Sequence, residues 1–239
     1  MGTATPLQPE KEIQLYDMEG CPFCRRVREV LTMLNLDFEV YPCPKNGTRF
    51  RPVAEKIIKS MGGSVSFPLM VDQNTGVKLQ ESQVIIDYLF KHYGKTGQTP
   101  TKWKNLSKQP IAGMLVSGAR LMHGLNADAT NINKSVPKQL IQLWSFEGSP
   151  YTRLVRERLC ELELPYVLHN VAKERWQDMG PAILRAKPGP YVPLAGGKRE
   201  KELSNMQGRL QVPFLVDHNT GVQMFESKDI IQYLNRTYG

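Results

Sequence analysis

The chain has 239 residues, of which 41% are apolar and 23% are charged, a composition typical of a globular protein and not of a disordered one. No window reaches the run of about 18 apolar residues that a membrane span needs, and the first twelve residues lack the pattern of a secretory signal. The formal net charge of +8 is spread along the chain, which argues against a nucleic-acid-binding patch.

The first predicted elements are a strand, a glycine turn, a helix and a second strand. Residues 13–16 form a short apolar run typical of a strand, and the turn EGCPFC follows it. The next segment keeps one helical face apolar, through Val27, Val30, Leu31 and Leu34. Residues 37–41 then predict the second strand.

A proline-led strand, a hairpin and a closing helix complete this unit. FPLMVD at residues 67–72 predicts a third strand, and the Asn-Thr-Gly that follows is a hairpin turn signal. The last helix is expected to begin with Ser82 as its N-cap and to run to the Tyr-Gly pair at Gly94. The order is therefore β-α-β, a variable region, then β-β-α.

The same unit occurs twice. Residues 13–41 align without gaps on 141–169, with 13 of 29 positions identical, and 67–94 align on 212–239, with 15 of 28 identical. We expect a first domain at 11–94, a linker at 95–138 containing a helix at 111–125, and a second domain at 139–239. The 17 extra residues of the second copy are expected in a surface loop within 187–208.

The second copy repeats the expected elements with two local differences. Its helix is expected to bury Tyr151, Val155, Leu159 and Leu162, and its last helix to begin with Ser227 as N-cap. EGSPYT replaces EGCPFC, so Ser149 and Thr152 stand where the first copy has cysteines. The second copy is therefore not expected to exchange disulfides.

Cys21 and Cys24 form a C-x-x-C pair at the start of the first predicted helix. Unpaired backbone N–H groups and the positive end of the helix dipole favour a thiolate there, so Cys21 is the candidate nucleophile and Cys24 the resolving thiol. Arg25, Arg26 and Arg28 would add positive potential. The competing hypothesis, half of a zinc site, is disfavoured because no second pair stands at zinc-site spacing, and we predict no metal.

CPFC after a strand, Phe-Pro before the third strand and Glu-Ser at the last helix together resemble glutaredoxins and the N-terminal domain of glutathione transferases. The resemblance covers both copies and implies an α/β fold of two tandem thioredoxin-like domains. It implies a cis Pro68, with Phe67 pairing its backbone with the cysteinyl part of glutathione. Glu81 and Ser82 would bind the γ-glutamyl end, and Arg25 would attract the anionic thiol.

The resemblance implies a glutathione-dependent thiol–disulfide oxidoreductase with glutathione as cosubstrate. Its expected partners are disulfide-containing or glutathionylated clients, with neither nucleic acid nor a membrane span. With only four cysteines, the chain favours a reducing compartment over secretion. We expect the cytoplasm, or a plastid stroma after removal of a transit peptide not present here.

Two alternatives remain open at this point. One is a glutathione-binding redox-sensing or scaffold module without turnover. The other is a transferase-like activity through Ser149, because Val212, Pro213, Glu226 and Ser227 preserve the second copy's counterparts of the glutathione-binding residues. The two remaining cysteines have simpler interpretations. Cys43 is interpreted as a structural or incidental loop thiol, with glutathionylation or a role as an extra resolving thiol as alternatives. Cys160 is expected to pack in the core.

Overall fold

The computed structural model describes residues 1–104, 123–128, 136–178 and 191–239. It forms one mixed sheet of eight strands in the order β4-β3-β1-β2-β6-β5-β7-β8. The first four strands belong to the first repeat and the last four to the second, so the two units extend each other's sheet. The predicted α/β class and the repetition of a thioredoxin-like unit are confirmed.

The first repeat has the expected order, with one additional helix. Within each repeat the first two strands are parallel and the later ones antiparallel. The elements are β1 (Ile13–Asp17), α1 (Pro22–Leu34), β2 (Phe38–Pro42), α2 (Arg51–Ser60), β3 (Leu69–Asp72), β4 (Val77–Gln80) and α3 (Ser82–Tyr93), followed by the short 3-10 helix η1 (Thr101–Trp103).

The second repeat follows the same plan. Its elements are β5 (Ile141–Ser145), α5 (Pro150–Glu161), β6 (Tyr166–Asn170), the 3-10 helix η4 (Trp176–Asp178), α6 (Lys198–Asn205), β7 (Phe214–Asp217), β8 (Val222–Phe225) and α7 (Ser227–Tyr238).

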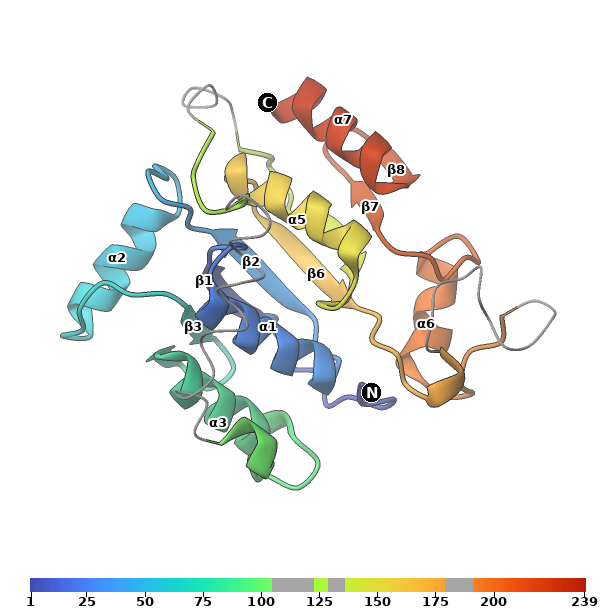
Figure 1. The fold of residues 1–239 in the computed structure, drawn as a ribbon, viewed down its shortest axis with the longest axis horizontal. Helices are drawn as coiled ribbons and strands as arrows, with labels where there is room; N and C mark the ends of the chain where they lie inside the picture. The colour runs from blue at the N-terminus through green and yellow to red at the C-terminus, as the bar shows by residue number, and fades with distance from the viewer. Residues whose placement is uncertain (105–122, 129–135, 179–190) are drawn as a thin grey trace.

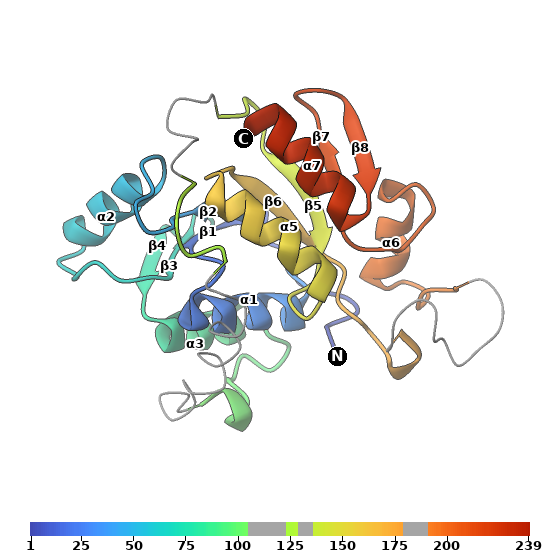
Figure 2. The same ribbon diagram turned by 45° about the horizontal axis from the view of Figure 1, so that its top comes forward.

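The two repeats meet edge to edge through β2 and β6. These strands are antiparallel, with Phe38 opposite Leu168, Glu39 opposite Val167 and Val40 opposite Tyr166. Figures 1 and 2 show α1 and α5 side by side across the sheet, with α3 beside α1 and α7 beside α5, while α2 and α6 lie toward opposite ends of the molecule. The contact between the repeats therefore lies at the centre of the sheet, and β4 and β8 form its two edges.

The core is shared on one face and divided on the other. On the shared face, buried side chains of α1, α3, α5 and α7 form one cluster with alternate residues of the strands, such as Leu15 and Leu143. The neighbouring residues Tyr16 and Trp144 point the other way, into two separate clusters that also contain Ile58 of α2 and Met206 near α6. This alternation is the period of two expected of a sheet covered on both faces.

Part of the expected loop at 187–208 is a helix in the described residues. Residues Lys198–Asn205 form α6, and Lys198, Arg199 and Glu202 within it are buried. The Nζ of Lys198 forms an ion pair with Asp37 of the first repeat and donates to the backbone oxygen of Asn35 at 3.1 Å. The charged residues of this segment suggested a surface loop, but Lys198 is buried because its partners lie in the first repeat.

Two further expectations differ from the structure, and a third falls mainly on residues that the structure does not describe. Tyr151 is 62% exposed, because α5 buries the adjacent stripe that includes Thr152 and Val155. Ser82 and Ser227 are the first helical residues, and the non-helical N-cap positions belong to Glu81 and Glu226. The expected helix at 111–125 falls mainly in residues the structure does not describe, and its described end at 123–125 is a turn.

Of the helices in the described ranges, none combines the length and apolar character that crossing a bilayer would require.

Candidate functional site

Strand registers bring the predicted site residues of the first repeat to one end of the sheet. Tyr16 of β1 lies opposite Leu69 of β3, and Leu69 lies opposite Gln80 of β4. Pro68 and Glu81 therefore lie one step beyond these pairs, at the end where β1 leads into the turn before Cys21. Residues distant in sequence meet because three neighbouring strands begin or end at the same level.

Cys21 is the N-cap residue of α1, and the residue is 7% exposed. A hydrogen bond from Cys24 is the largest influence lowering the pKa of Cys21; burial opposes it, while the backbone N–H groups of Cys24 and Phe23 and the charge of Arg28 lower it further, to about 7. Burial and the hydrogen bond to Cys21 raise the pKa of Cys24 well above its usual value. The pair therefore contains one thiolate-forming sulfur and one protonated sulfur near neutral pH.

Phe67 and Pro68 are joined by a cis peptide bond, as expected. The loop before them is held by Gln80, whose Nε2 donates to the backbone oxygens of Ser64 at 2.9 Å and Ser66 at 3.1 Å. The hydroxyl of Ser66 in turn lies 3.4 Å from Oε1 of Glu81. The end of β4 and the cis-proline loop are thus tied together beside the start of α3.

Glu81 adopts an unusual backbone conformation, with φ 68° and ψ 118°. A non-glycine residue at positive φ costs free energy, and such residues concentrate at binding sites. The conformation turns the chain sharply at the N-terminus of α3, where Ser82 is the first helical residue. Helix N-termini offer free N–H groups, which suit a carboxylate ligand.

Two arginines lie near this end of the first repeat. The guanidinium of Arg51, at the start of α2, stands 5.1 Å from the ring centroid of Phe67. Sequence inspection did not select Arg51, because it lies in the region that differs between the repeats; its position at the N-terminus of an added helix was the only available signal. Arg25 is partly exposed and its Nε lies 3.0 Å from Oε1 of Glu29.

The second repeat keeps the backbone geometry of the first. Val212 and Pro213 are joined by a cis peptide bond, and Glu226 has the same φ of 68° and ψ of 118° as Glu81. Gln211 donates to Glu226 Oε1 at 2.6 Å, which parallels the Ser66–Glu81 contact. Ser227 begins α7 as Ser82 begins α3.

Ser149 and Thr152 replace the two thiols by two hydroxyls in contact. Ser149 is the N-cap of α5; its Oγ accepts from the backbone N–H of Thr152 at 3.3 Å and from the Thr152 hydroxyl at 2.9 Å. Ser149 is 3% exposed and Thr152 is fully buried. The position retains an N-terminal hydrogen-bonding group but has no sulfur for exchange.

A buried cluster of charges lies beside both motifs, and the sequence did not reveal it. Arg28, expected to add positive potential near Cys21, is 1% exposed, and Arg156 is completely buried. Their partners are carboxylates from both repeats. The ion pairs are Arg28 with Asp17, Glu19 and Glu147, and Arg156 with Glu19 and Glu147. The signal available in the sequence was that Arg28 and Glu19 recur in register as Arg156 and Glu147.

Burial and the neighbouring charges shift the pKa values of the carboxylates in this cluster in different directions. Burial raises the pKa of Asp17 and of Glu19, and the two arginines offset this only in part. For Glu147, burial also acts upward, but Arg156 and Arg28 outweigh it and lower the pKa. Glu147 is therefore the firmly ionised partner of both guanidinium groups.

The remaining cysteines take no part in the site. Cys160 is 3% exposed and its thiol donates to the backbone oxygen of Gly124 at 3.3 Å, which agrees with core packing. Cys43 is completely buried, and burial raises the pKa of its thiol well above the usual value. Cys43 follows the end of β2 and belongs to the cluster beneath α2, which agrees with a structural thiol and not with an incidental one. Both are free thiols.

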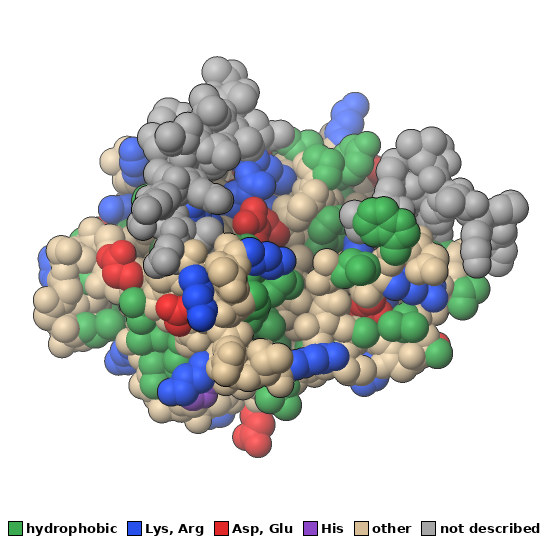
Figure 3. All heavy atoms as spheres, turned by 60° about the horizontal axis from the view of Figure 1, so that its bottom comes forward, with side chains coloured by type: hydrophobic (Ala, Val, Ile, Leu, Met, Phe, Trp, Pro, Cys, Tyr) green, Lys and Arg blue, Asp and Glu red, His purple; other side chains and the backbone are tan. Residues whose placement is uncertain are grey.

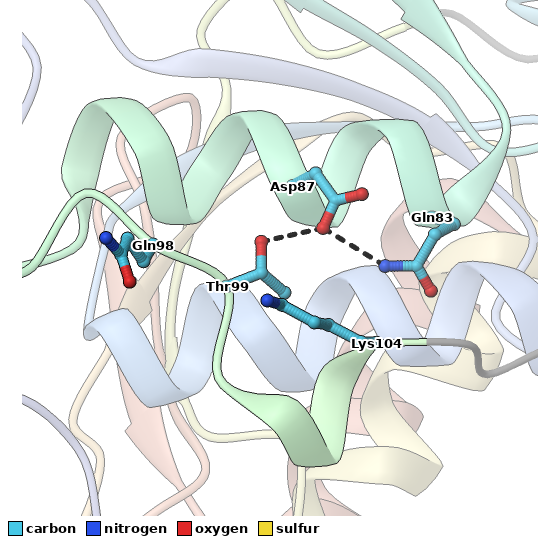
Figure 4. A pocket seen from close by; sticks show the side chains of 5 residues that line it. All are labelled: Gln83, Asp87, Gln98, Thr99 and Lys104. Carbon is cyan, nitrogen blue, oxygen red and sulfur yellow. Dashed lines mark hydrogen bonds between the residues drawn. The ribbon is translucent and has the colours of Figure 1, made fainter.

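A pocket of about 460 Å³ lies away from the thiols, between α3 and the chain that follows it (Figure 4). It is lined by Gln83, Asp87, Gln98, Thr99 and Lys104. The Asp87 carboxylate accepts from Gln83 at 3.2 Å and from Thr99 at 2.6 Å. Gln83 and Thr99 thus bond to Asp87 across the pocket, and none of the predicted site residues lines it.

The molecular face in Figure 3 shows Lys and Arg side chains interspersed with apolar and other polar surface. This agrees with the even spread of basic residues along the sequence.

A known family model matches each of the two repeats. The family model described as "Glutathione S-transferase, N-terminal domain" matches residues 15–98 and again 143–239. Among solved structures, a trimeric glutathione transferase of Leishmania aligns with 15% identity over 95% of this chain and 68% of that one, with a TM-score of 0.27. At that identity and score, the likeness carries no functional argument. No curated protein sequence matches the chain.

Proposed function

The chain belongs to the glutathione S-transferase N-terminal domain family, whose model matches both of its repeats, and we propose that its first repeat is a glutathione-dependent thiol–disulfide oxidoreductase. The observation that carries this proposal is the Cys21–Cys24 pair, in which the first thiol has its pKa lowered to about 7 while that of the second is raised. This division matches the needs of a nucleophile and a resolving thiol.

The proposed reaction is two successive thiol–disulfide exchanges. The Cys21 thiolate attacks one sulfur of a client disulfide; an S–S bond forms to Cys21 and the other client sulfur leaves as a thiolate, which takes up a proton. Cys24, after losing its proton, attacks Cys21 and releases the second client thiol, leaving a Cys21–Cys24 disulfide. Two glutathione molecules then reduce that disulfide and become glutathione disulfide, so two electrons pass from glutathione to the client.

Glutathione would lie between the redox turn and the start of α3. The backbone of Phe67 is proposed to pair with its cysteinyl part, and Ser82 and the first N–H groups of α3 with its γ-glutamyl carboxylate. Glu81 would accept from the α-amino group. Arg51, stacked on Phe67, supplies a cation for the second carboxylate, and Arg25 adds positive potential at the rim.

Reduction of a small mixed disulfide by glutathione tests this function. The wild-type chain should reduce the mixed disulfide of glutathione and β-mercaptoethanol, with glutathione disulfide formation followed through a coupled reductase. Cys21→Ser should abolish the activity, while Cys160→Ser should leave it unchanged. Equal activity in the Cys21→Ser variant contradicts the proposal. Absence of activity in a wild-type chain that still binds glutathione would instead favour the binding module.

The second repeat is proposed as a glutathione pocket without disulfide exchange. The specific support is the backbone conformation that Glu226 shares with Glu81 at the start of the last helix of each repeat. Ser149 can donate its hydroxyl proton to a bound thiolate, which is the chemistry of the transferase alternative. Calorimetry of the Cys21→Ser variant should give two binding events for S-methyl glutathione, and Glu226→Ala should remove one of them. If Ser149→Ala does not change conjugation of glutathione to 1-chloro-2,4-dinitrobenzene, the transferase alternative fails.

A further inference from the structure

Arg28 connects the redox turn to the second repeat. Its Nη2 donates to the backbone oxygen of Glu19 at 3.0 Å, and its Nη1 lies 3.4 Å from that of Met18. The Met18 oxygen also accepts from the backbone N–H of Cys21 at 3.0 Å. The guanidinium therefore holds the turn from which Cys21 projects, and its charge is one of the influences that lower the pKa of Cys21.

Arg28 is itself held by Glu147, which lies in the cysteine-free repeat. Its Nε donates to Oε2 of Glu147 at 3.0 Å and its Nη2 approaches Oε1 at 3.5 Å, a two-point contact. Glu147 is anchored on the first repeat as well, because its backbone N–H donates to the hydroxyl of Thr32 in α1 at 3.1 Å. The carboxylate is thus fixed at both its backbone and its side chain.

We propose that Glu147 is a positioning residue for Cys21: the second repeat completes the redox site of the first by fixing Arg28 against the turn that carries the nucleophile. This inference rests on the proposed role of Cys21. It assigns to the second repeat a contribution that needs neither a thiol nor a ligand of its own.

The charged groups that face this contact in the described part of the chain come from both repeats. Asp17 at the end of β1 and Glu19 in the turn face Arg28, and Arg156 of α5 faces both Glu19 and Glu147. Arg25 reaches to 3.9 Å from Glu147 Oε1. Because two arginines face three carboxylates in the buried cluster, removing Glu147 alone changes its net charge as well as its geometry.

Charge and position make opposite predictions for Glu147→Gln. If Glu147 acted only through its negative charge, its loss would stabilise the nearby thiolate and lower the pKa of Cys21. If it positions Arg28, its loss removes a guanidinium from the turn, and the pKa of Cys21 rises. The sign of the change therefore separates the two roles.

The test measures iodoacetamide alkylation of Cys21 against pH in the full chain, resolved by mass spectrometry. Glu147→Gln should slow alkylation at pH 7 about threefold and move the profile to higher pH. Glu200→Gln, the same chemical change at an exposed residue of the same repeat, should match wild type. A folded Glu147→Gln variant with an unchanged or faster profile overturns the proposal, as does equal slowing by Glu200→Gln.

A second variant tests the same proposal if the Glu147→Gln variant does not fold. Glu147→Gln combined with Arg156→Gln removes one charge of each sign, so the net charge of the cluster is retained while Arg28 still loses its contact with the carboxylate of Glu147. It should show the same slowing, and a wild-type profile in this variant contradicts the proposal. Alkylation does not depend on turnover: a wild-type chain without reductase activity would overturn the proposed function, while the shift in these variants would still decide the role of Glu147.

Discussion

The hydroxyl groups of Thr152 and Ser149 lie 2.9 Å apart at the start of α5, in the positions where α1 brings together the thiols of Cys24 and Cys21. Both pairs are buried, and both place their first member at the N-cap. The contact between the first and fourth residues of the motif therefore persists in the second repeat, with oxygen in place of sulfur.

Replacing Ser149 should destabilise the fold without affecting the redox site. Ser149→Ala removes the side-chain cap of α5 and leaves the buried Thr152 hydroxyl without this acceptor, at a cost of about 1 kcal/mol in the free energy of unfolding. Urea unfolding measures the cost. Adding Thr152→Val should increase it by less than Thr152→Val costs alone, since the two hydroxyls share one hydrogen bond. Full additivity would contradict that contact.

Cys24 should tune Cys21 by hydrogen bonding, in addition to acting as a resolving thiol. Its hydrogen bond is the largest influence lowering the pKa of Cys21, so Cys24→Ala should raise that pKa toward the ordinary thiol value. Cys24→Ser retains a donor and should raise it less. Thiolate absorbance at 240 nm against pH measures both variants. If alanine and serine give the same pKa, the hydrogen bond is not the cause.

The alkylation rate of Cys21 should increase with pH as its thiol loses a proton. With a folded-state pKa of about 7, the thiolate forms as pH rises, so the alkylation rate should increase about tenfold per pH unit well below 7 and level off above about 8. Because this pKa is lowered on folding, its contribution to stability is present above the ordinary thiol pKa and is lost as pH falls through 7. A midpoint above pH 8.5 would show that the folded chain does not activate Cys21.

Glu81 should lower the stability of the fold through its backbone conformation and strengthen glutathione binding through its carboxylate. Glu81→Gly relieves the positive φ and should leave the free energy of unfolding unchanged or about 1 kcal/mol higher. The same substitution removes the carboxylate and should weaken glutathione binding to the first repeat, measured by calorimetry. Glu81→Ala separates the two effects, since it keeps the strain but lacks the carboxylate. Destabilisation by glycine larger than by alanine would contradict the argument from strain.

Much of the fold could be predicted because the spacing of apolar residues and the positions of glycine and proline indicate the same elements in both copies. The apolar stripe through Val27, Leu31 and Leu34 specified α1, and the prolines at 68 and 213 marked the starts of β3 and β7. The position of Cys21 and Cys24 at the start of α1 could also be predicted, because they follow an apolar strand and a glycine turn. These signals are local, so a single sequence contains them.

What could not be predicted depends on contacts between the repeats. The sequence around Arg28 does not indicate that it is buried, because one of its three carboxylate partners, Glu147, lies 119 residues away. Lys198 likewise has the local sequence of a solvated loop and finds Asp37 only after the repeats associate. A buried charge cannot be distinguished from a surface charge until its partner is known.

The register of β2 on β6 has a consequence for how the two halves can change. Glu39 faces Val167, which is its own counterpart in the second repeat, while Phe38 and Val40 exchange partners symmetrically around that pair. This is the self-complementary geometry of a twofold-symmetric homodimer, achieved within one polypeptide. In a true homodimer, each substitution would occur twice. Covalent fusion removes that constraint, so one half can keep its thiols while the other specialises behind an unchanged interface.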